Sequence, residues 1–157
     1  MTNPEILIAL GANMPSRAGL PADTLKAAIA ALDQAGVAVL KVSSFHETAA
    51  WPDPLEPSFT NAVASLQTML KPVALLELLH AIETAYGRVR SLPNAPRTLD
   101  LDLLAHGDAV LTTASLTLPH PRLAQRRFVL QPLAEVAPGW RHPVTGLSPA
   151  QMLAALA

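Results

Sequence analysis

The chain has no cysteine among its 157 residues, which rules out disulfide bonds and thiolate metal sites. Aromatic residues make up only 4% of it, too few for a surface on which nucleic-acid bases stack. An excess of charge of one sign is also lacking: the net charge is −1, so no broad positive surface attracts a phosphate backbone. These absences argue against a nucleic-acid-binding protein.

Long hydrophobic runs are missing as well. The apolar run in the N-terminal stretch MTNPEILIALGANMPS is far too short to span a membrane, and no basic segment precedes it as in a signal peptide. We therefore predict a cytoplasmic protein with no membrane partner. Half of the residues are hydrophobic, which suits one compact domain over residues 1–157, and we expect it to be a monomer.

Hydrophobic periodicity predicts the order of helices and strands. Predicted strands cover 5–10, 37–49, 59–68, 95–107 and 109–113, and predicted helices cover 21–36, 71–87, 126–137 and 148–157. The helix over 71–87 is expected to bury a stripe made of Val73, Leu76, Leu79 (or Leu78), Ile82 and Tyr86. The order predicts an α+β fold of the ferredoxin-like βαββαβ type. Its mainly antiparallel sheet would carry helices on one face, followed by accessory C-terminal helices.

The stretch APRTLDLDLLAHG (95–107) carries the first candidate site. Alternate residues of a strand point to opposite faces, so the leucines enter the core while Asp100 and Asp102 project together. A solvated strand face is the plain alternative. Two carboxylates on one face are also hard oxygen ligands suited to Mg²⁺, which takes one or two carboxylates together with phosphate oxygens and waters.

Three arginines strengthen the metal–phosphate interpretation. Arg88 and Arg90 follow the long helix, and Arg97 precedes the acidic strand. Charge balance at a helix end would explain them too, yet guanidinium forks beside carboxylates are what a polyphosphate–metal site requires. No Walker sequence or glycine-rich kinase loop is present, and Gly11-Ala12-Asn13 is interpreted as a turn. Any ATP would therefore be held by side chains.

Two further groups are candidates for substrate contacts. The stretch LPHPRLAQRRF (118–128) contains His120, Arg122, Arg126 and Arg127, a possible second phosphate clamp, although a lone histidine in such a loop is more often structural. Phe59 and Asn61 share one strand face. Phe59 could simply belong to the core, or the pair could stack on a flat heterocycle and bind its edge.

The motifs together resemble the 6-hydroxymethyl-7,8-dihydropterin pyrophosphokinase family of folate biosynthesis. They are ALGAN (9–13), SSFHET (43–48), FTNAV (59–63), GRVR (87–90), PRTLDLDLL (96–104) and LPHPRL…RRFVLQPLAEVAP (118–138). The resemblance implies a ferredoxin-like fold and transfer of pyrophosphate from ATP to the hydroxymethyl group of the pterin, with release of AMP.

The resemblance also implies roles for individual residues. Asp100 and Asp102 would bind two Mg²⁺ ions, and Arg88 and Arg97 would act with them in catalysis. The implied ATP-binding residues are Glu83, Arg88, Arg90, Arg97, Thr98, His120 and Arg126, and the implied pterin-binding residues are Thr48, Ala49, Ala50, Trp51, Phe59, Asn61 and Phe128.

Two other functions are alternatives to this one. A non-catalytic ferredoxin-like module that binds a small ligand has no reason to direct two aspartates and three arginines at one site. A Mg²⁺-dependent nuclease would need a positive surface, which the balanced charge disfavours.

Overall fold

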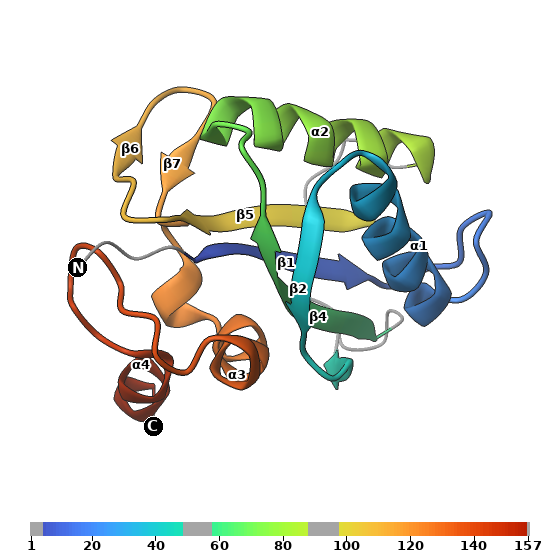
Figure 1. Ribbon diagram of the computed structural model, residues 1–157. Coiled ribbons are helices and arrows are strands. Elements are labelled where there is room, and N and C mark those ends of the chain that lie inside the picture. Colours follow the sequence, from blue (N-terminus) through green and yellow to red (C-terminus); the bar gives the residue numbers. More distant parts are fainter. Residues whose placement is uncertain (1–4, 49–57, 88–97, 157) are drawn as a thin grey trace.

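The computed structural model describes residues 5–48, 58–87 and 98–156. Its main sheet contains β1 (Ile6–Ala12), β2 (Ala38–Val42), β3 (His46–Thr48), β4 (Phe59–Gln67) and β5 (Asp100–His106). The strand order is β2-β4-β1-β5, every pairing is antiparallel, and β3 also pairs with β4. Helix α1 (Pro21–Gln34) follows β1 and α2 (Pro72–Ala85) follows β4, so the ferredoxin-like βαββαβ prediction is confirmed (Figure 1).

The C-terminal part adds a small hairpin and three further helical segments. The hairpin joins β6 (Leu111–Thr112) to β7 (Thr117–Leu118). The 3₁₀ helix η1 (Leu123–Gln125), α3 (Arg127–Val136) and α4 (Pro149–Ala155) follow. The strand predicted over 109–113 is thus reduced to two residues, and it pairs with β7 in a separate sheet. None of the helices in the described ranges has the length and apolar character needed to cross a membrane.

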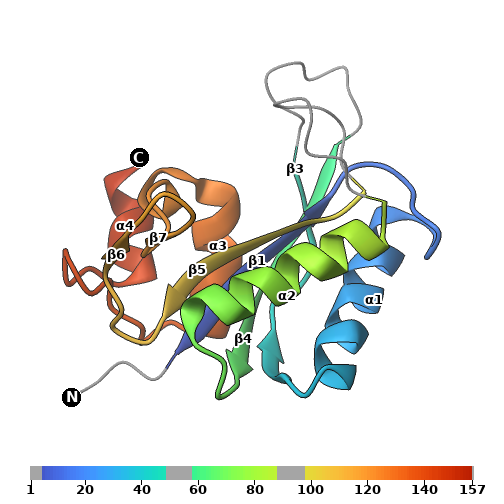
Figure 2. The same ribbon diagram turned by 90° about the horizontal axis from the view of Figure 1, so that it is seen from above.

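The α1 and α2 helices share one face of the main sheet, as predicted, and the accessory helices α3 and α4, for which no face is predicted, cover the other (Figures 1 and 2). One core packs α1 and α2 against residues such as Ile8, Leu10 and Leu101. A second core packs α3 and α4 against Leu7, Val63 and other residues that point the opposite way. The α3 helix is strongly amphipathic and contains a buried proline, Pro132, in its interior.

The buried stripe of α2 also differs from the prediction. The fully or nearly buried positions are Leu75, Leu79, Ile82 and Glu83, whereas Val73 is 49% exposed. A stripe shifted by two residues at its start still has the 3.6-residue period. The predicted stripe therefore had the right period and a wrong first member, and it did not include the buried carboxylate.

The strand predicted over 37–49 is divided into β2 and β3. The pairing with β4 shifts by one residue between Val39 and Lys41, and by another between Val42 and His46. At the second shift the buried Ser43 accepts a hydrogen bond from the Val63 N–H through its hydroxyl oxygen, at 3.0 Å. The Ser43 hydroxyl thus takes the place of a strand carbonyl as the acceptor for the Val63 N–H. Each extra residue turns the residues after it to the opposite face of the sheet.

Candidate active site

One row of residues crosses four strands of the sheet. Gly11 on β1 pairs with Asp100 on β5 and with Asn61 on β4, and Asn61 in turn pairs with His46 on β3. Residues directly opposite each other in antiparallel strands point to the same face. The row therefore joins a candidate metal ligand to a candidate pterin ligand across a residue that has no side chain.

The β5 strand separates leucines from carboxylates as its alternation predicts. Leu99, Leu101 and Leu103 are at most 3% exposed and belong to the core beneath α1 and α2. Asp100 and Asp102 occupy the other parity and are half-buried. Both carboxylates thus lie on the face that α3 and α4 share.

A β-bulge docks His120 beside these aspartates. Leu103 pairs with Ile8 and Ala105 with Leu7, so Leu104 is an extra residue in β5. The Leu104 carbonyl accepts a hydrogen bond from the His120 N–H at 2.9 Å. Bulges near functional sites commonly redirect the chain in this way. Here the bulge fixes the loop after β7 against β5, two residues after Asp102.

The protonation state of His120 follows from its surroundings. Burial, and then the positive charges of Arg126 and Arg122, lower its pKa from 6.5 to about 4, while Asp100 acts in the opposite direction. His120 Nδ1 accepts a hydrogen bond from the Arg122 N–H at 3.2 Å, which assigns the ring proton to Nε2. At neutral pH His120 is therefore an uncharged N–H donor beside a carboxylate and two guanidinium groups.

This pKa predicts a pH-dependent loss of stability. An unfolded chain protonates His120 below about pH 6.5, but the folded protein does so only near pH 4. The free energy of unfolding is therefore expected to fall as the pH drops from 6.5 towards 4. The slope should stay below ~1.4 kcal/mol per pH unit, because His120 is partly open to solvent. Urea unfolding at several pH values should show a shallower decline for His120→Asn. Identical slopes in the two proteins would contradict this origin.

An open cavity of about 250 Å³ adjoins the Asp102 carboxylate. Its wall is made by Leu76 of α2, Asp102 and Leu103 of β5, residues 113–117 of the β6–β7 hairpin, and His120 and Pro121. Sites for drug-sized ligands are typically larger, about 300–1,000 Å³. The cavity lining mixes apolar side chains with hydroxyl groups, the Asp102 carboxylate and His120, which suits a small polar heterocycle.

Glu83 is anchored at the edge of β5. Its side chain is completely buried, and its Oε2 accepts a hydrogen bond from the Leu101 N–H at 2.7 Å. A buried carboxylate is tolerated only when it is hydrogen-bonded or paired. Because Leu101 lies between the two aspartates, Glu83 fixes the backbone that carries both of them.

A second group of side chains lies across Gly11. The Asn61 Nδ2 donates a hydrogen bond to the Thr48 hydroxyl at 2.9 Å, and Phe59 precedes Asn61 by two residues on the same face of β4. Phe128, in the first turn of α3, is 39% exposed. Its ring lies 5.5 Å from the Arg126 guanidinium, which links this group to the surroundings of His120.

Gly11 belongs to β1, which corrects its interpretation as part of a turn. A Cβ atom at this position would lie 2.9 Å from Asn61 Oδ1 and 4.0 Å from the Phe59 ring. Glycine inside a strand often marks such a close approach, and this signal could have identified Gly11 from the sequence. Gly11 lets the Asn61 side chain lie flat over β1.

Gly11→Ala is therefore expected to displace the Asn61 side chain. The new methyl group is too close to Oδ1 to be accommodated without a shift. We expect about tenfold weaker pterin binding, because the lost edge contact is worth about 1–2 kcal/mol. Affinity for a non-hydrolysable ATP analogue should stay within about twofold. Titration calorimetry with each ligand measures both, and unchanged pterin affinity would contradict the prediction.

Several predicted site residues lie outside the described ranges. These are Ala49, Ala50, Trp51, Arg88, Arg90 and Arg97. Thr98, the first described residue after them, has a buried hydroxyl oxygen with no hydrogen-bond partner in the described part of the chain. The structure thus brings together Asp100, Asp102 and His120 with Arg126, and groups Thr48, Phe59 and Asn61 beside them.

The carboxylates of this site are of the type that Mg²⁺ prefers. Within residues 5–48, 58–87 and 98–156, no group of three or more histidine and carboxylate side chains is positioned to hold a metal. The protein alone therefore supplies no complete cage there. Two adjacent carboxylates fit Mg²⁺, which commonly keeps several waters and takes its other ligands from phosphate oxygens.

Comparison with known proteins identifies the family. The model of the family described as 7,8-dihydro-6-hydroxymethylpterin-pyrophosphokinase matches residues 7–138. The 2-amino-4-hydroxy-6-hydroxymethyldihydropteridine pyrophosphokinase of Synechocystis sp. is 42% identical over 148 residues, which cover 94% of this chain and 73% of the relative. The protein of the same name from Bacillus subtilis is 42% identical over 134 residues, 82% of this chain and 75% of the relative.

A solved structure shares the fold. It is described as a crystal structure analysis of HPPK-DHPS in complex with substrates, and it superposes with a TM-score of 0.70 over 98% of this chain and 43% of its own. At 12% sequence identity it supports the fold alone. The family match covers most of the chain and includes every motif singled out above. The chain belongs to the 7,8-dihydro-6-hydroxymethylpterin-pyrophosphokinase family.

Proposed function

We propose that this chain transfers pyrophosphate from ATP to the hydroxymethyl group of 6-hydroxymethyl-7,8-dihydropterin, with release of AMP, and that Asp100 and Asp102 hold the Mg²⁺ required. The row that joins Asp100 to Asn61 through Gly11 supports the proposal, because it sets a candidate metal ligand beside a candidate heterocycle ligand on one face. Family membership supports the reaction and its place in folate biosynthesis.

ATP would be held by side chains on the β5 side. The cavity beside Asp102 would take the base. His120 would donate its Nε2–H to a phosphate oxygen, and the Arg126 guanidinium would supply positive charge next to it. Thr98 has a buried hydroxyl that a ligand could satisfy. Arg88, Arg90 and Arg97 stay predictions from the sequence as phosphate ligands, with Arg88 and Arg97 acting in the transition state.

Two Mg²⁺ ions are proposed, and when bound they would neutralise charge on the phosphate oxygens. Asp100 and Asp102 would bind them from the sheet face. Glu83 was assigned to ATP binding by resemblance. Its hydrogen bond to the Leu101 N–H supports a role through the backbone between the two aspartates.

The pterin would lie over β1 and β4. Its flat ring would stack between Phe59 and Phe128, and its polar edge would meet Asn61 and Thr48, with Ala49, Ala50 and Trp51 continuing that edge. The hydroxymethyl oxygen would attack the β-phosphorus of ATP and lose its proton to solvent, while the bond from that phosphorus to the α–β bridging oxygen breaks and AMP leaves. Such transfers depend chiefly on positioning and charge neutralisation, so no strong general base is required.

The test is product identification after incubation with Mg²⁺, ATP and the pterin. AMP together with the pterin diphosphate supports the proposal. ADP would indicate an ordinary kinase, and no nucleotide product would favour a binding module. Residues 1–157 are proposed to act as a single, monomeric, cytoplasmic domain, and sedimentation of the purified protein with both substrates tests the monomer.

A further inference from the structure

A cluster formed by Ser44, His46 and Glu135 joins the sheet to α3. The Glu135 Oε1 accepts hydrogen bonds from the Ser44 N–H at 2.9 Å and from the Ser44 hydroxyl at 2.8 Å. The Glu135 Oε2 contacts His46 Nε2, which also lies 3.2 Å from the Ser44 hydroxyl oxygen. None of the roles assigned above uses these three side chains.

The cluster is not a nucleophilic triad. In such a triad the two ring nitrogens of a histidine face different partners, one the serine and the other the acid. Here the same nitrogen of His46 faces both, and the Ser44 hydroxyl donates directly to Glu135. The Ser44 oxygen is therefore not activated for attack, and the arrangement is that of a structural link.

The bulge between β2 and β3 places His46 on the face of the sheet that α3 covers. Val42 pairs with Ala64, which faces the core beneath α1 and α2. After one extra residue, His46 pairs with Asn61 on the opposite face, while Phe45 packs against the first core. Without that residue His46 would share the face of Val42.

The link lies beside the proposed pterin ligands on the same face of the sheet. His46 is the cross-strand neighbour of Asn61, and Thr48, two residues further along β3, accepts the Asn61 hydrogen bond. A shift of β3 relative to β4 would therefore move two of the groups assigned to the pterin edge.

The other end of the link lies on the helix that carries Phe128. Glu135 is seven residues after Phe128 in α3, close to two full turns, so the two side chains lie on one stripe of the helix, ~10 Å apart along its axis. Burial raises the pKa of the Glu135 carboxyl, but hydrogen bonds from Ser44 and His46 outweigh this and lower it. Glu135 is thus a charged anchor at neutral pH.

We propose that Ser44, His46 and Glu135 form a latch that sets the spacing between the β3–β4 wall and Phe128, and thereby determines affinity for the pterin. This inference rests on the proposed function, since it takes Phe128, Asn61 and Thr48 as pterin ligands. The three latch residues are positioning residues that do not touch the substrate. The latch joins β3 to α3, and these two elements approach the ligand from different sides. Without the latch, the pterin site is less preorganised.

The test compares Glu135→Ala with Glu135→Gln. We expect about five- to tenfold weaker pterin binding for the alanine variant, in calorimetry with an ATP analogue present. Glutamine keeps an oxygen that accepts from Ser44, so it should stay within about threefold of the wild type. Affinity for the ATP analogue alone should change less than twofold in both. In steady state the KM for the pterin should rise while kcat stays nearly constant.

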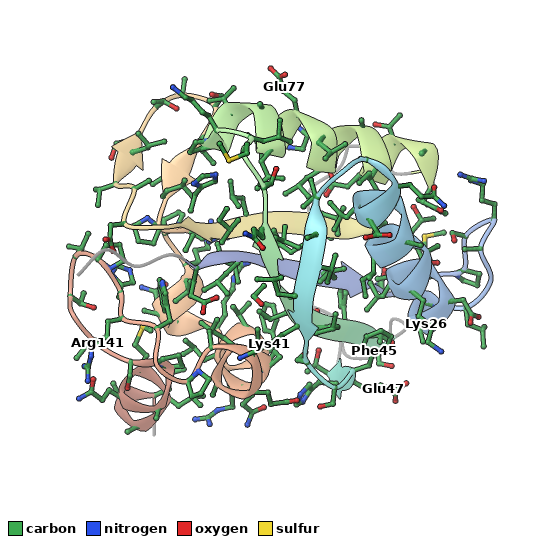
Figure 3. The ribbon with its side chains drawn as sticks, in the orientation of Figure 1. Lys26, Lys41, Phe45, Glu47, Glu77 and Arg141 are labelled. Atoms are coloured by element: carbon green, nitrogen blue, oxygen red, sulfur yellow. The ribbon has the colours of Figure 1, made fainter. Side chains whose placement is uncertain are left out.

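The matched control is Glu47→Gln. It removes a carboxylate from β3, the strand that carries His46, but on the opposite face of the sheet. Glu47 is exposed and extends from the body of the protein, as Figure 3 shows. The Glu47→Gln substitution should leave the affinities for the pterin and for the ATP analogue unchanged. Should Glu135→Ala fail to fold, Ser44→Ala removes one bond of the latch and should weaken pterin binding about two- to threefold.

The outcomes separate the latch from the site assignment. If Asn61→Ala and Phe128→Ala leave pterin affinity unchanged, the proposed pterin site is wrong. If those two variants weaken binding and neither Glu135→Ala nor Ser44→Ala does, the latch alone is wrong. Equal losses for pterin and ATP analogue in Glu135→Ala would also overturn it, because they would indicate a general structural role.

Discussion

Replacing Asp100 and Asp102 together by asparagine should lower the rate of AMP formation by at least about a thousandfold at saturating substrates. Asparagine keeps the shape of each side chain but removes the charge that would hold Mg²⁺ against the phosphates. Each single substitution should cost about a hundredfold or more. Because the two carboxylates would share ions and phosphates, the effects of the single changes should not add.

The fold should survive both substitutions. Leu99, Leu101 and Leu103 bury the other face of the same strand and are untouched. Near-unchanged thermal unfolding would confirm this, and Asp33→Asn on the exposed end of α1 provides a control with full activity. A wild-type rate in the double variant at saturating Mg²⁺ would show that the aspartates do not serve as metal ligands.

Phe128→Ala should weaken pterin binding by about 1–3 kcal/mol, or roughly five- to 150-fold. The alanine removes both the apolar area and the aromatic face expected to stack on the pterin. Phe128→Leu restores the apolar area but not the aromatic face, and it should recover about half of the lost binding free energy. The measurement is calorimetric titration of the pterin in the presence of an ATP analogue.

Nucleotide affinity provides the internal comparison for Phe128. The Arg126 guanidinium lies 5.5 Å from the ring and keeps its charge without it, so the ATP analogue should bind within about fivefold of the wild-type affinity. If both ligands lose affinity equally, Phe128 stabilises the domain as a whole and does not form a wall of the pterin site.

The alternation of leucine and aspartate in β5 is sufficient to predict which face each side chain occupies, since a strand has a period of two. The bulge at Leu104 is hidden from that argument. The alternation ends in a continuous apolar run of Leu103, Leu104 and Ala105, which does not show that a residue is extra; only the pairing with β1 reveals it. The position of His120 depends on this bulge and could therefore not be derived from sequence spacing.

The face of the second helical layer could not be predicted for a related reason. Local patterns show that α3 has an apolar side, but not which face of the sheet receives it. Val63 and Leu7 provide the answer, because they point away from α1 and α2 and are completely buried. Long-range packing of this kind is set by tertiary contacts. By contrast, the start of α4 was predicted correctly from Ser148, whose hydroxyl accepts the Gln151 N–H at 3.2 Å.

Pro132 has a consequence for local unfolding of α3. A proline has no N–H, so the Phe128 carbonyl four residues earlier lacks its usual partner within the helix. The last turn, in contrast, is tied to the sheet through Glu135. The free energy of local opening is therefore lowest at the start of the helix, and amide hydrogens there should exchange before those near Val136. The ring assigned to the pterin is thus carried by the part of α3 that can open while the rest of the domain stays folded.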